Sequence, residues 1–266
     1  MRAEEALRKL GGERPLVHHI TNYVTVNLVA NVTLCMGALP IMAHAHEEVE
    51  EMEEITSALV LNIGTLDPAQ VEAMLLAGKR ANERSVPVVL DPVGAGATTL
   101  RTETARRLIS ELSIAAVCGN AGEIATLAGL EAEVRGVESL AGDAREAAVQ
   151  AARALNTTVA ATGETDYVSD GETVLAVHNG HPLMGRLVGS GCASTAVIGC
   201  FAAAGGGDPE TVASALAFFG RAGEVAAESA GSPGTFEPRL LDAISALATD
   251  PEGLDEDFRT KKASAG

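Results

Sequence analysis

The chain has 266 residues, 47% of them hydrophobic and only 3% aromatic, so a single large core must be packed by Val, Ala, Leu and Ile. Its 36 acidic and 19 basic residues give a formal net charge of −17. This charge argues against nucleic acid or an anionic membrane as a partner, because both require a basic face. An acidic surface with few lysines is typical of proteins that work in high salt, although an ordinary acidic cytosolic enzyme can have the same composition.

The cysteines and the N-terminus indicate where the protein acts. The four cysteines show neither a C-x-x-C pair nor the spacing of metal ligands, and the sequence has no N-terminal signal pattern. No apolar run reaches the roughly 18 residues that a membrane-spanning helix needs. We therefore expect a cytoplasmic protein with reduced cysteines and no membrane partner.

The first two thirds of the chain alternate between strand and helix patterns. Short apolar runs predict strands at 16–20, 39–42, 58–61, 86–90, 114–117 and 157–161. Helical spacing of apolar residues predicts helices at 2–10, 23–36, 47–54, 68–82, 99–111, 123–128 and 139–155. Repeated strand–helix units of this kind predict an α/β fold with a mostly parallel sheet and helices on both faces.

The last third departs from this alternation. Asp170-Gly171 between two apolar runs predicts a β-hairpin over 166–178. A buried helix is expected from Ala193 to Ala204, and Asp208-Pro209 is a strong helix start, so helices are expected at about 211–230 and 237–247. The sequence therefore predicts one domain over 1–250, followed by a flexible polar tail over 251–266.

Residues that directly follow parallel strands are the first candidates for chemistry, because ligands bind at the carboxyl ends of such strands. Asp91 follows the strand 86–90 and precedes a glycine-rich loop, so it can reach a hydrated metal while the backbone approaches phosphate. Thr162 follows the strand 157–161, and Glu123 lies in the first turn of a predicted helix. The alternatives are an Asp-Pro turn for Asp91, an ordinary strand-end threonine and a solvated helix-terminal acid.

The segment Gly189-Ser190-Gly191-Cys192 leads into the buried helix. A glycine-rich start of this kind points backbone N–H groups and the positive end of the helix dipole at an anion, such as a phosphate. Cys192 falls in the first turn, where the same field is expected to lower the pKa of its thiol. The alternative is a glycine turn before a core helix with a buried cysteine.

Taken together, His181-Pro-Leu-Met184 and Gly189–Cys192 resemble the catalytic segment of hydroxyethylthiazole kinases, which are ribokinase-like enzymes of thiamin salvage. Four further segments match that family in the right order, so the resemblance runs from about residue 15 to 245. They are Thr21–Tyr23, Met42–Glu48, Asn62–Thr65 and Asp91–Thr98. The resemblance implies a single ribokinase-like kinase domain.

The resemblance also implies a reaction and a set of roles. The γ-phosphoryl group of ATP would pass to the hydroxyethyl oxygen of 4-methyl-5-(2-hydroxyethyl)thiazole, with Cys192 beside that oxygen to take its proton late in the transfer. The Gly189–Cys192 amides would stabilise the transferring group. Similar enzymes are trimers that bind thiazole between subunits, so a homotrimer is expected. The remaining roles implied are Asp91 and Glu123 for Mg²⁺, Asn22, Met42 and Gly189 for thiazole, and Cys118 and Thr162 for the nucleotide.

Two positions depart from the family pattern and keep other functions open. Cys118 stands where similar enzymes carry an arginine that contacts nucleotide phosphate, and a thiol cannot make that charged, bidentate contact. Val188 replaces a common threonine and lacks its hydroxyl. One alternative is therefore a thiazole-binding protein without catalysis. Another is a different ribokinase-like kinase, for example of hydroxymethylpyrimidine, although those carry aspartate at the position of Cys192.

Overall fold

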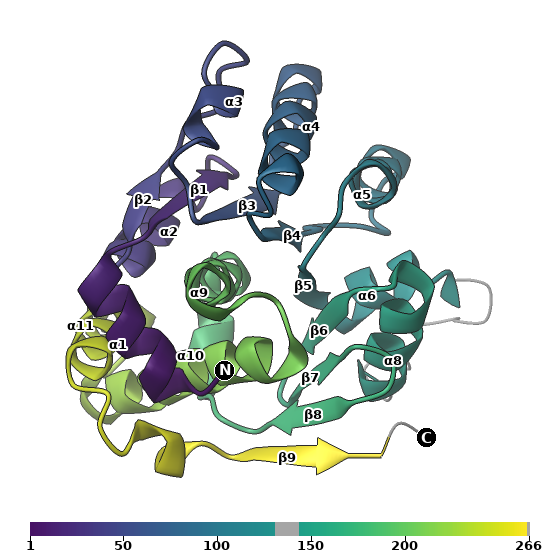
Figure 1. Cartoon of the computed structure of the whole chain (residues 1–266). Helices are drawn as coiled ribbons and strands as arrows, with labels where there is room; N and C mark the ends of the chain where they lie inside the picture. Colours follow the sequence, from purple (N-terminus) through teal and green to yellow (C-terminus); the bar gives the residue numbers. More distant parts are fainter. Residues whose placement is uncertain (131–143, 265–266) are drawn as a thin grey trace.

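The computed structural model describes residues 1–130 and 144–264 of the chain. Within these residues, one nine-stranded sheet has the order β2-β1-β3-β4-β5-β6-β7-β8-β9 (Figure 1). The strands are β1 (Leu16–Ile20), β2 (Leu39–Ile41), β3 (Ala58–Asn62), β4 (Val88–Asp91), β5 (Ala116–Asn120), β6 (Thr158–Thr162), β7 (Asp166–Ser169), β8 (Val174–Val177) and β9 (Thr260–Ala263).

Helices cover both faces of this sheet, as the strand–helix alternation predicted. The α-helices are α1 (Ala3–Glu13), α2 (Val26–Cys35), α3 (Val49–Met52), α4 (Pro68–Glu83), α5 (Thr99–Glu111), α6 (Ala121–Leu127), α8 (Ala144–Leu155), α9 (Ser190–Gly205), α10 (Pro209–Ser229) and α11 (Pro233–Thr249). The described residues also contain the 3₁₀ helices η3 (Pro182–Arg186) and η4 (Leu254–Asp257). None of the helices in the described ranges is both long and apolar enough to cross a membrane.

The sheet has a parallel half and an antiparallel half. Strands β2, β1, β3, β4, β5 and β6 run parallel, whereas β7, β8 and β9 each pair antiparallel with the strand before them in the sheet. The parallel register places Asn62 opposite Asp91, and Asn120 opposite Thr162. Four polar residues are thereby brought to the carboxyl edge of the sheet, which is the edge formed by the C-terminal ends of the parallel strands.

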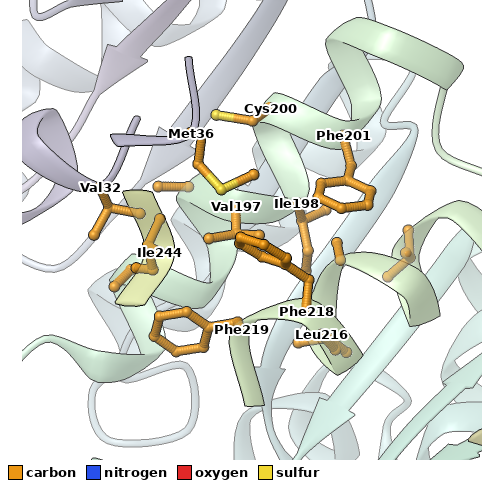
Figure 2. Packing of buried hydrophobic residues seen from close by; sticks show 14 of the residues in the cluster. Val32, Met36, Val197, Ile198, Cys200, Phe201, Leu216, Phe218, Phe219 and Ile244 are labelled. Carbon is orange, nitrogen blue, oxygen red and sulfur yellow. The ribbon is translucent and has the colours of Figure 1, made fainter. Parts of the chain in front are cut away.

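Two hydrophobic layers pack on the two faces. Helices α1, α2, α9, α10 and α11 cover one face, and α4, α5, α6 and α8 cover the other. Helix α9 lies at the centre of the first layer, where Phe201 meets Phe218 of α10 at 6.0 Å between ring centroids (Figure 2). A Cβ on Gly199 would lie 2.3 Å from Val60 Cγ2, so this glycine lets α9 approach β3 closely. The start of α9 is consequently held against the carboxyl edge of the sheet.

Most predicted elements are confirmed, including the hairpin formed by β7 and β8. Strand β5 lies two residues later than its predicted start, the helix predicted from residue 23 begins at Val26, and only 49–52 of the predicted helix 47–54 is helical. Residues 139–143 of the predicted helix 139–155 lie outside the described residues.

Residues 251–264 differ from the flexible polar tail predicted for 251–266, of which 265–266 lie outside the described residues. Leu254 is buried in the core, the Asp255 carboxylate accepts a bond from the Ala3 amide at 3.1 Å, and β9 pairs with β8 along its length. Strand β8 would otherwise form the edge of the sheet, and the backbone of an edge strand readily pairs with another segment. The hydrophobic pattern of the sequence does not indicate β9, because this strand carries the exposed Lys261 and Lys262 in place of buried apolar residues.

Candidate active site at the carboxyl edge of the sheet

The site is organised around the N-terminus of α9. Gly189 precedes this helix with φ of +89°, a conformation that favours glycine, and a Cβ there would lie 2.5 Å from Thr25 Cγ2. The glycine therefore lets the chain turn tightly against the start of α2. The Ser190 amide donates to the Leu187 carbonyl at 3.3 Å, but no side chain caps the helix, so the Gly191 and Cys192 amides that follow remain available to an anion in front of it.

Cys192, in the first turn of α9, is half-buried among side-chain amides. Its sulfur lies 3.4 Å from Asn22 Nδ2 and 3.3 Å from Asn62 Nδ2. Burial and the negative charge of Asp91 raise the pKa of the Cys192 thiol, although the amide donors and the Thr25 hydroxyl oppose this shift. The expectation of a lowered pKa is therefore wrong, because desolvation and a nearby carboxylate outweigh the donors around the sulfur.

Asn62, at the end of β3, connects the groups of this site. Its Nδ2 donates to Asp91 Oδ2 at 2.6 Å as well as to the Cys192 sulfur. Its Oδ1 accepts bonds from Asn22 Nδ2 and from the Gly64 amide, both at 2.9 Å. Asn62 is not among the site residues predicted from the sequence. The signal that could have found it is its position directly after a buried strand, the same criterion that selected Asp91.

Asp91 and Glu123 line a small cavity of about 190 Å³ at the start of α9. Burial and the charge of Glu123 raise the pKa of Asp91 to about 7, and burial also raises the pKa of Glu123. Glu123 accepts bonds from the Gly94 amide at 2.7 Å and the Asn120 amide at 2.8 Å. Two acids that disfavour each other's charge in one cavity provide a setting that a divalent cation would relieve.

The donor set at this cavity fits Mg²⁺ better than a tightly held structural metal. No group of three or more His, Cys, Asp or Glu in residues 1–130 and 144–264 has the geometry of a metal site. Mg²⁺ is commonly bound by one or two carboxylates together with waters and substrate phosphates. Asp91 and Glu123 provide that arrangement.

Cys118 and Thr162 lie on the floor and the rim of the same cavity. Cys118 is 2% exposed in β5, and burial together with the charge of Asp91 raises the pKa of its thiol strongly. Thr162 ends β6, and its hydroxyl donates to the Gly119 carbonyl at 3.2 Å. A buried thiol here contributes an uncharged floor, in contrast to the cationic group expected from the family pattern.

A larger cavity of about 960 Å³ continues from the small one. The two share Thr162, Gly189 and Gly191, so they meet at the start of α9. The larger cavity lies between the loop after β6, the loop after β8 and helix α10, where Phe219 and Gly220 line it. Its volume lies in the range of cofactor-binding pockets.

Of the three residues expected on the acceptor side, Gly189 lines both cavities, whereas Asn22 and Met42 lie outside them. Asn22 is buried and bonded to Asn62, and Met42 follows β2 and packs against the main core. Tyr23 and Val24, which follow Asn22, are 63% and 69% exposed, so an apolar surface lies next to these groups.

Comparisons with known proteins agree with this architecture. A sequence profile of the Hydroxyethylthiazole kinase family matches residues 7–250. The hydroxyethylthiazole kinase of Rubrobacter xylanophilus is 71% identical over 267 residues, with 100% of both chains covered. The solved structure of a hydroxyethylthiazole kinase protein from Pyrococcus horikoshii OT3 is 42% identical with a TM-score of 0.87, and 98% of each chain is covered.

A more distant structure supports the fold alone. A ribokinase-like superfamily protein from Enterococcus faecalis V583 has a TM-score of 0.65 at 12% identity, covering 94% of this chain and 90% of that chain. The predicted ribokinase-like α/β fold is confirmed by these structural matches.

Proposed function

The chain belongs to the hydroxyethylthiazole kinase family, and from this premise we propose that it phosphorylates the hydroxyethyl group of 4-methyl-5-(2-hydroxyethyl)thiazole in thiamin salvage. The phosphoryl donor is ATP. The observation that carries the proposal is the network of Cys192, Asn62 and Asp91 at the N-terminus of α9. It brings a thiol and a carboxylate to a helix N-terminus without a side-chain cap, where a hydroxyl and a phosphate could meet.

The phosphates of ATP would lie where the two cavities join. The Gly191 and Cys192 amides would stabilise the charge on the transferring group, because Gly191 lines both cavities and no side chain caps the helix. Thr162 would contact the phosphates from the opposite side, on the shared rim. Asp91 and Glu123 would hold Mg²⁺, which supplies charge neutralisation at the phosphates when it is bound.

Cys192 would take the proton of the acceptor hydroxyl. Because the pKa of the Cys192 thiol is raised, its thiolate is a strong proton acceptor. The fraction of Cys192 present as thiolate stays small while Asp91 is charged nearby. Neutralising the charge of Asp91 removes one cause of that shift. The transition state of phosphoryl transfer is loose, so the proton needs to leave only late, when the bond to the new oxygen is forming.

The thiazole ring would bind against Asn22, Met42 and Gly189, next to the exposed Tyr23 and Val24. This apolar surface supports a homotrimer in which a second subunit completes the thiazole pocket, because large exposed apolar groups commonly mark an interface. The free cysteines and the use of ATP fit a cytoplasmic protein.

A turnover assay tests the proposed function. ADP release with ATP and the hydroxyethylthiazole should depend on both substrates and on Mg²⁺, and a hydroxymethylpyrimidine should not replace the thiazole. Thiazole binding without ADP release would instead identify a non-catalytic thiazole-binding protein. That alternative is favoured by one observation, the buried Cys118 at the position of the family arginine.

A further inference from the structure

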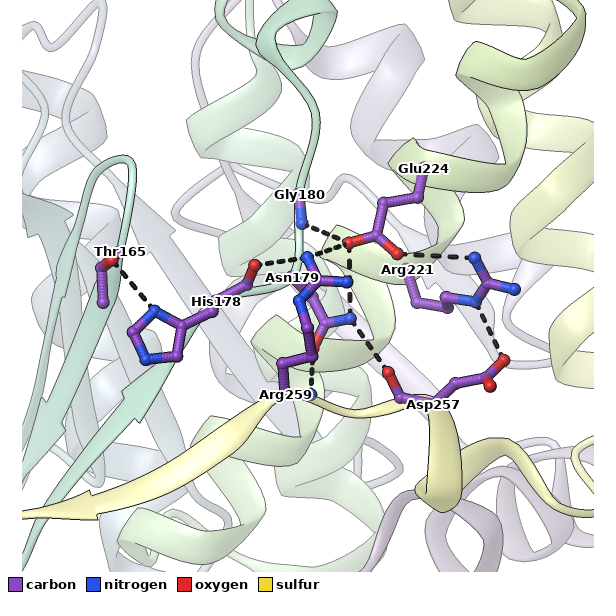
Figure 3. A network of polar contacts seen from close by, with 8 residues as sticks. All are labelled: Thr165, His178, Asn179, Gly180, Arg221, Glu224, Asp257 and Arg259. Atoms are coloured by element: carbon purple, nitrogen blue, oxygen red, sulfur yellow. Dashed lines mark hydrogen bonds and ion pairs between the residues drawn. The ribbon is translucent and has the colours of Figure 1, made fainter.

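The segment 254–263, which comprises η4 and β9 and is called the C-terminal strap below, contacts the wall of the larger cavity. The strap runs along β8 at the edge of the sheet (Figure 1). Beyond β8, the chain forms the loop 178–181, and all four of its residues line the cavity. Figure 3 shows that polar contacts join the strap, this loop and α10.

The backbone of the strap holds the buried Asn179 side chain from two sides. Asn179 Oδ1 accepts a bond from the Arg259 amide at 2.7 Å, and Asn179 Nδ2 donates to the Asp257 carbonyl at 3.3 Å. In return, the His178 amide donates to the Arg259 carbonyl at 3.1 Å. Two consecutive residues of the cavity wall are therefore fixed by the strap itself.

Glu224 of α10 joins the strap to the next residue of the wall. Its Oε1 accepts bonds from the Gly180 amide at 2.9 Å and from Arg259 Nη2 at 2.6 Å. Arg259 Nη2 also donates to the His178 carbonyl at 2.5 Å, and Arg221 pairs with both Glu224 and Asp257. The Arg259 guanidinium thus contacts His178 of the cavity wall directly and Gly180 through Glu224. These bonds are charge-assisted and therefore stronger than neutral ones.

The opposite side of the loop has little room to move. Gly220 of α10 lines the cavity, and a Cβ on it would lie 2.4 Å from the Asn179 carbonyl oxygen. His178 Nδ1 lies 3.2 Å from the Thr165 hydroxyl, which belongs to the facing wall. If the strap contacts were lost, the wall could therefore shift only toward the cavity or into solvent, and either shift changes the shape of the cavity.

We propose that Arg259 is a positioning residue for nucleotide binding, which it supports by holding the loop 178–181 through Glu224 and the His178 carbonyl. The inference rests on the proposed nucleotide site in the larger cavity. Arg259 acts on the shape of that cavity and has no part in the transfer at Cys192. Its loss should therefore weaken ATP binding, and leave the thiazole side and the chemical step unchanged.

The test compares Arg259→Met with wild-type enzyme. Methionine keeps much of the length of the side chain but cannot bridge Glu224 and His178. We expect the KM for ATP to rise about tenfold, since small misplacements of a binding wall have large effects, while kcat and the thiazole KM stay within about twofold. Arg259→Lys should recover part of the ATP affinity through a single charged bond. Arg239→Met is the matched control, because Arg239 pairs with Asp242 on the surface of α11.

A second substitution separates this inference from the proposed nucleotide site. Gly185 lines the larger cavity, and a Cβ there would meet nothing within 4 Å, so Gly185→Phe should obstruct nucleotide with room for the new Cβ. An unchanged ATP KM in Gly185→Phe would overturn the nucleotide site itself. A raised KM in Gly185→Phe with an unchanged KM in Arg259→Met would overturn the role of Arg259 alone. If Arg259→Met lowered kcat and raised the KM values for ATP and for thiazole by equal factors, and Arg259→Lys recovered none of this, Arg259 would be only a general stabiliser of the fold.

Discussion

The parallel and antiparallel halves of the sheet contribute to the site in different ways. In the parallel half, side chains at the ends of β3 and β4 form a buried network in which Asn62 bonds to Asp91 and Cys192. In the antiparallel half, the strap backbone and a partly exposed ion pair between Arg259 and Glu224 hold a loop in place. The first half supplies chemical groups, and the second supplies the shape of a cavity.

We therefore expect the two halves of the sheet to control different kinetic parameters. Substitutions in the buried network should change the rate of transfer, because those groups lie where the proposed hydroxyl and phosphate meet. Substitutions in the antiparallel half should change the affinity for nucleotide. A substitution in the Cys192–Asn62–Asp91 network that altered only the nucleotide affinity, or one in the antiparallel half that altered only kcat, would contradict this division of roles.

The largest effect is expected for Cys192→Ala in the parallel half. Without a group to take the acceptor proton, kcat should fall about 10²–10⁴-fold while thiazole binding changes little. Cys192→Asp should retain activity, because a carboxylate can serve the same role at the same helix terminus. Cys35→Ala is the control, since that half-buried cysteine ends α2. Wild-type turnover of Cys192→Ala, measured as ADP release, would make Cys192 a packing residue.

Asn62→Leu should be the most costly change to the network itself. Leucine leaves the Asp91 carboxylate and the Gly64 amide without their Asn62 partner, and an unsatisfied buried polar group typically costs about 1–3 kcal/mol. We expect the free energy of unfolding to fall by about 3 kcal/mol in urea titrations, together with a loss in kcat. Asn31→Leu is matched to it, because Asn31 is bonded to Asn27 on the surface of α2. Equal stabilities of the two variants would contradict a structural role of the network.

Cys118→Arg tests a residue of the parallel strand β5 that lies outside the Asn62 network and lines the small cavity. If a guanidinium there reaches the phosphates, the KM for ATP should fall by up to about 10–150-fold, the worth of one charge-assisted bond. The thiazole KM should stay constant, and kcat should change less than KM because the contact exists before and during transfer. Cys118→Leu controls for volume. An unchanged or raised KM for ATP would show that another group already serves in place of the arginine, with Arg186→Ala as the next variant to measure.

The parallel half could be predicted largely from sequence because its signals are local. Buried strands appear as apolar runs, and Asp91 directly follows one of them, so its position at the carboxyl edge followed from the topology alone. The same reasoning could have selected Asn62, although one strand-end asparagine is not distinctive by itself. The pKa of Cys192 was predicted in the wrong direction because desolvation and the nearby Asp91 depend on tertiary packing, which the position of a residue in a helix does not specify.

The antiparallel edge was only half predictable. The Asp170-Gly171 turn identified the hairpin of β7 and β8, but β9 lies more than 80 residues away and carries lysines in place of an apolar pattern. Its pairing with β8 is made by backbone groups, which every sequence possesses. The contacts of Arg259 with Glu224 and His178 likewise depend on that pairing. Hydrophobic periodicity therefore cannot indicate such a strap.

The smallest expected effect concerns Asp166 at the start of β7, where it lines the larger cavity and accepts a bond from the Gly163 amide at 2.9 Å. Burial raises the pKa of Asp166 to about 7 in the folded protein, against an ordinary value of 3.8. Between these values the folded state keeps a proton that the unfolded state has lost. The stabilisation from Asp166 is thus complete below about pH 4 and is lost as pH rises toward 7.

Asp166→Asn removes this dependence, because an amide carries no charge to bury at any pH. The free energy of unfolding, measured in urea from pH 4.5 to 7.5, should therefore fall less steeply with pH in the variant than in the wild-type protein. Asp170→Asn provides the control, since Asp170 is exposed in the turn of the same hairpin. The slope that remains in Asp166→Asn should include the contribution of Asp91, whose pKa is also raised, so the variant separates the two halves. Identical slopes for wild-type and Asp166→Asn protein would show that Asp166 makes no contribution to the pH dependence of stability.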